Sequence, residues 1–445
     1  MTQDSSGLVR AIGRWSLAAL MLNAVVGASI FGVPSLIAGY LGKFSPVAYL
    51  VAAVGVAAIA ACLAEVGSQF RETGGPYLYA RAAFGPLVAL QVGWLSWLSR
   101  IAAAAGISEV FASYLTQFFP AAGVSIVRAA VLALLVSVLA AVNYRGVRSG
   151  TRLSNFFTAA KVLIIVSFIG AGAWALLWHP EVHVVPTEIH ITRRNWLEAV
   201  LLLVNSFAGF ESVLFASGET RDPRKDAPVA LLVALAAATF LFIAVQYIVI
   251  YTLPASATSS TPVADAARRF LGPAGAALMA VGAMICTYGS LSAHLLTTPR
   301  ITFAMGEQGD FPRFFAAVHP RFRTPYLSIG AFVGPMLIFA VAGNLRWNSI
   351  LSAVSRLCVY AYLALALPVL RKKQPEADAF RLPGATFFVV VALLFTAILV
   401  TRISASGFLV LGITLALGLM NWLWVTRSSR TLGEASSRRL LSEEE

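Results

Sequence analysis

The chain has 445 residues, of which 58% are hydrophobic and only 12% are charged, and its mean hydropathy is +0.79. A soluble protein of this length needs more polar surface, so the composition excludes a soluble domain and indicates an all-α polytopic membrane protein. The net charge of +13 does not indicate nucleic-acid binding, because the basic residues lie in short loops between apolar stretches and form no basic face.

Hydrophobic runs along the chain predict twelve transmembrane helices. The expected spans are 15–40, 46–70, 86–117, 125–143, 153–178, 196–217, 228–252, 274–298, 325–342, 348–370, 385–401 and 405–426. Residues 1–14 then form a cytoplasmic N-terminal segment, and residues 427–445 form a polar cytoplasmic tail that we expect to be disordered at its end. Placing both termini in the cytoplasm assigns most of the 33 lysine and arginine residues to the inner side, as the positive-inside rule requires.

Small, flexible residues interrupt two of these spans. The first interruption comprises Val26, Gly27, Ala28, Ser29, Ile30, Phe31 and Gly32, and the second comprises Ser206, Phe207, Ala208, Gly209, Phe210 and Glu211. An interrupted helix in lipid leaves backbone N–H and C=O groups unpaired, which is tolerated only where they face protein, water or a ligand. Paired interruptions at matching places in two halves of a chain predict the substrate site of a transporter. The alternative is tight helix packing through small residues.

Two charged side chains lie deep in apolar spans. Lys161 is in the fifth span, where burial favours the neutral amine, so the residue can titrate; a lysine that snorkels to the surface is the alternative. Arg100 is in the third span and stays protonated, so it needs an acceptor. Glu109 lies nine residues on, at roughly the opposite helix face. Arg100 therefore either pairs with Glu211 or a carbonyl, or contacts an anionic group of a substrate.

No metal or cofactor is predicted. Three of the five histidines lie in the outer loop 179–194, where two prolines break any helix that would align them, and no cysteine or acidic ligands accompany them. The three cysteines lie in apolar spans, which predicts small core residues and no disulfide framework. The spans contain no aspartate and the chain has no nucleotide-binding fingerprint, so we expect neither an enzyme nor a primary pump.

Several motifs, in register over some 300 residues, resemble the amino acid–polyamine–organocation superfamily of secondary transporters. They are Gly27-Ala28-Ser29-Ile30-Phe31, Ala64-Glu65-Val66-Gly67, Gly74-Gly75-Pro76-Tyr77, Ala83-Phe84-Gly85-Pro86, Asn143-Tyr144-Arg145-Gly146-Val147, Gly209-Phe210-Glu211, Gly218-Glu219-Thr220-Arg221-Asp222-Pro223 and Gly309-Asp310-Phe311-Pro312-Arg313. The resemblance implies a leucine-transporter-like fold. Two inverted five-helix repeats would occupy 15–178 and 196–370, followed by two extra helices at 385–426.

The resemblance also implies the chemistry of the site. Backbone amides at Ala28, Ser29 and Ile30, at the start of a half-helix, would bind the carboxylate of an amino acid. Carbonyls near Phe207, Ala208 and Gly209, together with those of residues 23–26, would bind its ammonium. Ser29 stands where the family has a second glycine, so it narrows the pocket or restricts the backbone.

Further side chains are assigned by the same resemblance. An amine from the fifth helix replaces the sodium ion in similar family members, so Lys161 is expected to carry a proton or to act as a fixed cation. Phe207 and Phe210 would either cover the substrate or pack in the core, and Tyr288 would lie near the site. Glu211, Glu65 and Glu219 are expected in gates or a proton relay, Glu65 and Glu219 with Arg145 and Arg300; solvated loop charges are the alternative.

The expected function is sodium-independent, proton-coupled transport of amino acids across the cell membrane by alternating access. The expected partners are an amino acid, a proton and the lipid bilayer. An exchanger, a polyamine or amine transporter, and a sensor that binds without transporting are the alternatives. Arg100 argues weakly against cationic substrates.

Overall fold

The structure is a computed structural model that describes residues 13–70, 75–145, 150–186, 189–211, 223–254, 256–322, 324–373 and 379–443. These residues form helices and connecting turns, with no strand among them. The helices are α1 (Arg14–Val25), α2 (Ser29–Leu41), α3 (Ser45–Ser68), α4 (Gly75–Phe84), α5 (Pro86–Leu115), α6 (Ser125–Arg145), α7 (Gly150–Trp178), α8 (Arg193–Ser206), α10 (Pro223–Thr252), α11 (Pro262–Thr297), α12 (Pro299–Glu307), α13 (Tyr326–Ala342), α14 (Leu345–Lys373), α15 (Ala385–Val400) and α16 (Ala405–Glu443).

The protein is a multi-pass membrane protein. Within the described ranges, eight helical stretches are long and apolar enough to cross a membrane, and α13 and α15 are shorter apolar helices. The expected first span is divided into α1 and α2. Of the expected sixth span, at residues 196–217, only α8 and the turn that follows it are described. The count of twelve spans and the inverted repeat therefore stay predictions.

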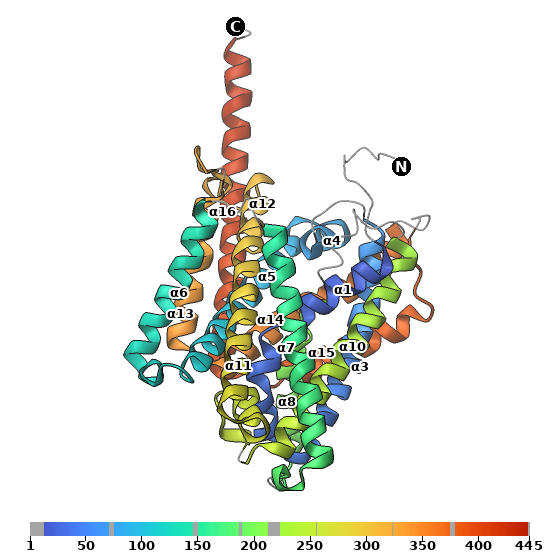
Figure 1. Ribbon diagram of the computed structural model, residues 1–445. Coiled ribbons are helices and arrows are strands. Elements are labelled where there is room, and N and C mark those ends of the chain that lie inside the picture. The colour runs from blue at the N-terminus through green and yellow to red at the C-terminus, as the bar shows by residue number, and fades with distance from the viewer. Residues whose placement is uncertain are drawn as a thin grey trace.

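Helices α5 and α14 form the centre of the bundle (Figure 1). Most of their residues are buried, whereas most of α6 and of residues 405–425 in α16 is exposed and apolar, as expected for helices that face lipid. Small residues bring α5 and α14 close together. Ser99 donates a hydrogen bond to the carbonyl of Ser352 at 3.0 Å, and Ser352 donates one back to the carbonyl of Ser99 at 2.8 Å.

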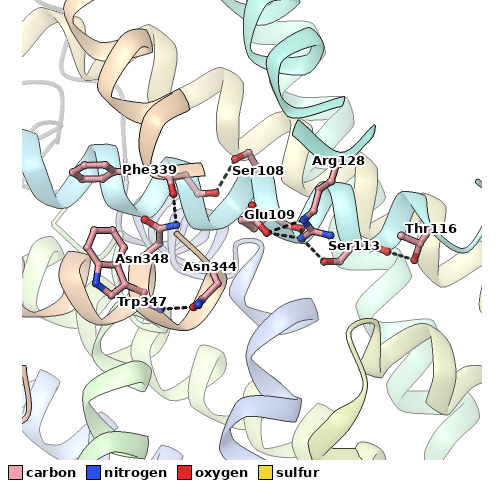
Figure 2. Close-up of polar contacts among 10 residues, drawn as sticks. Ser108, Glu109, Ser113, Thr116, Arg128, Phe339, Asn344, Trp347 and Asn348 are labelled. Carbon is pink, nitrogen blue, oxygen red and sulfur yellow. Dashed lines mark hydrogen bonds and ion pairs between the residues drawn. The ribbon is translucent and has the colours of Figure 1, made fainter. Parts of the chain in front are cut away.

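A partly buried ion pair fixes the far end of α5. Arg128 of α6 donates to the Glu109 carboxylate and, at 3.0 Å, to the hydroxyl of Ser113, as Figure 2 shows. In the same region Asn348 of α14 donates to the carbonyl of Phe339 at 3.0 Å, which ties α14 to α13. Glu109 therefore pairs with another helix and not with Arg100 of its own helix, in agreement with the sequence analysis.

The C-terminal segment differs from its expectation. Residues 427–443 continue α16 as a helix that projects from the bundle, instead of ending in a disordered tail (Figure 1). The segment contains no proline, and ten of its 17 residues are arginine, leucine, glutamate or alanine, which are strong helix formers, so helical propensity outweighs its polarity.

Candidate substrate site at the two helix breaks

The first break separates α1 from α2. Val26 has φ −76° and ψ 81°, which is not helical, so the chain leaves the helix after Val25 and resumes it at Ser29. The N–H groups of Phe31 and Gly32 both donate to the carbonyl of Ala28, at 3.1 and 3.3 Å. The N–H groups that precede them, at the start of α2, have no acceptor within the helix, because a helix leaves its first amides unpaired. The positive end of α2 thus lies inside the protein.

The second break follows α8, which ends at Ser206. Residues 207–211 form a turn in which Gly209 has φ +116°, a conformation that favours glycine. Glu211 stabilises this turn by accepting a hydrogen bond from the N–H of Gly209 at 2.9 Å. The remainder of the expected sixth span, and Glu219 with it, lies outside the described residues.

The two breaks are in direct contact. A Cβ atom on Gly209 would lie 2.6 Å from the carbonyl oxygen of Ala24 and 3.0 Å from the nitrogen of Val25, so only glycine fits there. Gly27 faces α11, since a Cβ atom on it would lie 3.8 Å from the hydroxyl oxygen of Ser290. The last turn of α1, the turn after α8, and α11 therefore meet at one place.

Lys161 binds at the end of α1. Its Nζ donates a 2.6 Å hydrogen bond to the carbonyl of Asn23, which lies in the last turn of α1, where carbonyls have no helical donor. The side chain is buried, and Cys286 of α11 is close enough to interact with its charge. The Asn23 carbonyl was expected to receive the substrate ammonium. It instead already accepts a hydrogen bond from Lys161, which leaves the carbonyls after it for a substrate.

Glu211 joins the second break to α14. Its carboxylate pairs with the Arg356 guanidinium and accepts a 3.1 Å hydrogen bond from the hydroxyl of Tyr360. Both members of the ion pair are almost completely buried. Removing one member of such a pair leaves an uncompensated charge, which strongly destabilises a protein. Glu211 therefore holds the turn against α14.

Arg100 belongs to the same cluster. Its guanidinium, from α5, lies within electrostatic range of Glu211, Arg356 and Tyr360. His294 of α11 is close to the same charges. Two arginines thus surround one described carboxylate, beside the second break. This placement is compatible with both roles that the sequence left open, pairing with Glu211 and contact with a substrate anion.

The aromatic residues of the second break pack in the core. Phe207 is fully buried and contacts Phe242 edge-on at 5.3 Å between ring centroids. Phe210 packs on Tyr360 at 5.4 Å. Tyr288 packs beside the apolar cluster that contains Ile101. Phe207 and Phe210 thus pack in the core in this structure, and their role in covering a substrate stays a prediction.

Glu65 lies near the end of α3, where that helix meets the end of α14. Its fully buried carboxylate accepts two hydrogen bonds from Arg371, at 2.6 and 2.7 Å, and one from the N–H of Leu382 at 2.8 Å. Arg300, one of its expected gate partners, instead donates to the carbonyl of Leu296 at 2.8 Å. Glu65 therefore joins α3 to the end of α14.

Three buried polar atoms next to the breaks have no hydrogen-bond partner within the described part of the chain. They are the Oδ1 atoms of Asn23 and Asn205 and the hydroxyl oxygen of Ser206. The sequence analysis did not single out these side chains. The signal available there was weak: Asn23 lies three residues before the first interruption, Asn205 lies directly before the second, and Ser206 begins the second.

Comparison with known proteins gives the family of the chain. Residues 12–425 match the family described as amino acid permease. The chain belongs to the amino acid permease family. Its relatives include the methylthioribose transporter of Bacillus subtilis (strain 168), 30% identical over 404 residues, which cover 85% of each chain. The serine/threonine exchanger SteT of the same organism is 26% identical over 93% of each chain. The branched-chain amino acid permease BcaP, also from this organism, is 24% identical over 97% of this chain and 96% of its own.

Proposed function

We propose that this permease moves amino acids across the cell membrane by alternating access, without sodium and coupled to protons. Both termini lie in the cytoplasm in this proposal. The observation that supports it is the contact between Gly209 and the end of α1, because the end of α1 and the turn after α8 both carry backbone groups without a helical partner. Unpaired amides and carbonyls at helix ends complement the two charges of an α-amino acid.

The substrate carboxylate would bind at the amides of Ala28, Ser29 and Ile30, at the positive end of α2. The ammonium would bind at carbonyls of Val26 and of the turn that contains Ala208 and Gly209. The hydrogen bond from Lys161 to Asn23 supports sodium independence, since an ammonium between α7 and α1 provides the positive charge that a bound ion would otherwise supply.

Uptake into proteoliposomes tests this function. Purified protein is reconstituted with an imposed pH gradient, and a mixture of labelled amino acids is added in sodium or in choline buffer. We expect uptake that is unchanged by choline and reduced when a protonophore collapses the gradient. Uptake that needs sodium would contradict the coupling, and binding with no uptake in any condition would indicate a sensor.

Exchange is the second candidate, because the serine/threonine exchanger SteT matches nearly the whole chain. An exchanger needs substrate on both sides of the membrane. Vesicles preloaded with unlabelled amino acid would then take up label many times faster than empty vesicles, and the pH gradient would have little effect. Equal rates in empty and preloaded vesicles would exclude obligatory exchange.

A further inference from the structure

The buried polar atoms beside the breaks need donors that the described protein does not supply. Asn23 is the third residue from the end of α1, and Asn205 and Ser206 are the last two residues of α8. Most buried polar side-chain atoms in folded proteins are hydrogen-bonded, and an unbonded one costs about 1–3 kcal/mol. Three such atoms on the two segments that meet at a proposed ligand site indicate a ligand.

The surroundings of these atoms fit a bound molecule. Asn23, Asn205, Gly27 and Gly209 are partly accessible, whereas Leu201, Leu202 and Leu203 on the preceding turn of α8 are fully buried. Ser206 itself is 2% exposed. Asn205 and Gly209 are thus more accessible than the turn of α8 that precedes them.

The kind of atom restricts the ligand. The Asn Oδ1 atoms accept hydrogen bonds, and the Ser206 hydroxyl both accepts and donates. A hydroxyl or amide group supplies the matching donor, while an aliphatic group supplies none. Cationic side chains are disfavoured by Arg100, Arg356 and Lys161, which outnumber the one described carboxylate, Glu211. A carboxylate side chain would be repelled by the acceptor oxygens.

We propose that Asn205, with Ser206 and Asn23, forms the specificity pocket of this transporter and selects neutral amino acids whose side chain carries a hydroxyl or amide. This proposal rests on the proposed function, because it assumes that the two breaks form the amino acid site. A site built to hydrogen-bond a substrate group rejects an isosteric substrate that lacks it, because its own polar atoms are then left buried and unpaired.

Threonine and valine provide the test, because they have nearly the same shape and differ by one hydroxyl. Ligand-induced thermal shifts of the purified full-length chain in detergent give the affinity for each. We expect threonine to bind at least about tenfold more tightly than valine, because one unmade buried hydrogen bond costs about that factor. Asparagine and leucine serve as a second pair, and aspartate and lysine as charged probes.

Three variants separate the pocket from general packing. Asn205→Leu removes the amide and keeps the volume, and Ser206→Ala removes one buried oxygen; both should lower the threonine-to-valine ratio toward one while valine still binds. Asn143→Leu is the matched control. Asn143 also has a buried Oδ1 atom without a hydrogen-bond partner in the described part of the chain, but it lies in the last turn of α6 and not on α1 or α8. This variant should leave the ratio unchanged. If Asn205→Leu does not fold, Ser206→Ala decides.

Several results would overturn the proposal. The first is a threonine-to-valine affinity ratio near one in the unmodified protein, and the second is a ratio that neither pocket variant changes. The third is stronger binding of aspartate or lysine than of threonine. The fourth is that the variants weaken the binding of every amino acid equally, which would place these atoms at the substrate ammonium. The binding assay does not need transport. Selective binding without uptake would therefore contradict the proposed transport function and support the specificity pocket. Uptake without selectivity would support transport and contradict the specificity pocket.

Discussion

Gly209 is the residue on which the meeting of the two breaks depends. Its φ of +116° and its contact with the backbone of Ala24 leave no room for a Cβ atom. We expect Gly209→Ala to destabilise the protein by about 1–3 kcal/mol from backbone strain alone and to abolish uptake. Thermal unfolding in detergent and proteoliposome uptake measure the two effects.

Gly330→Ala is the matched control, because a Cβ atom on Gly330 meets nothing within 4 Å and the residue lies inside α13. Alanine there should leave uptake intact and raise stability slightly, since glycine inside a helix is less stable than alanine by about 0.5–1 kcal/mol. If both variants lost activity equally, the special role of Gly209 would be wrong.

Lys161 is the second residue whose role can be tested alone. Its ammonium is held at the Asn23 carbonyl, so Lys161→Ala should leave the end of α1 unpaired and lower uptake at least about tenfold. If Lys161 carries the proton, the residual uptake should no longer vary with pH. Lys161→Arg keeps a charge that cannot be lost. Unchanged pH dependence in both variants would exclude the proton role.

At the scale of elements, helix junctions depend on a few buried ion pairs. Glu65 of α3 is fully buried, whereas the side chain of its partner Arg371 is 33% exposed. The two deletions should therefore be unequal. Arg371→Met strands a buried carboxylate and should cost about 3–5 kcal/mol, whereas Glu65→Gln leaves a partly solvated arginine and should cost less. Melting temperatures in detergent compare the two, and an equal or opposite order would contradict this account.

A second junction joins α4 to the segment after α12. Tyr77 donates to the Asp310 carboxylate, and Arg81 pairs with the same carboxylate at 3.0 Å. Burial raises the pKa of the Tyr77 hydroxyl well above its ordinary value, so it stays a neutral donor. This network joins α4 to the segment after α12, and Glu65 with Arg371 joins α3 to α14. Neither contact involves a residue of the breaks.

At the scale of the whole molecule, orientation is the property to test. The charge distribution predicts that the loop at Glu181 lies outside and the turn at Phe314 lies inside, and both side chains are exposed. In a variant whose three cysteines are replaced by alanine, Glu181→Cys should react with a membrane-impermeant maleimide on intact cells. Phe314→Cys should react only after the membrane is opened. The reverse pattern would invert the topology.

The amino acid sequence by itself determined the membrane class and the family resemblance, and it predicted interruptions at residues 26–32 and 206–211, because hydropathy and small residues act locally along the chain. It also marked Lys161 and Arg100 as charges deep in apolar spans. It did not predict that Lys161 binds Asn23, that Glu211 pairs with Arg356, or that Glu65 pairs with Arg371. These partners are 138, 145 and 306 residues apart, and only the packing of the helices decides which buried charge meets which acceptor.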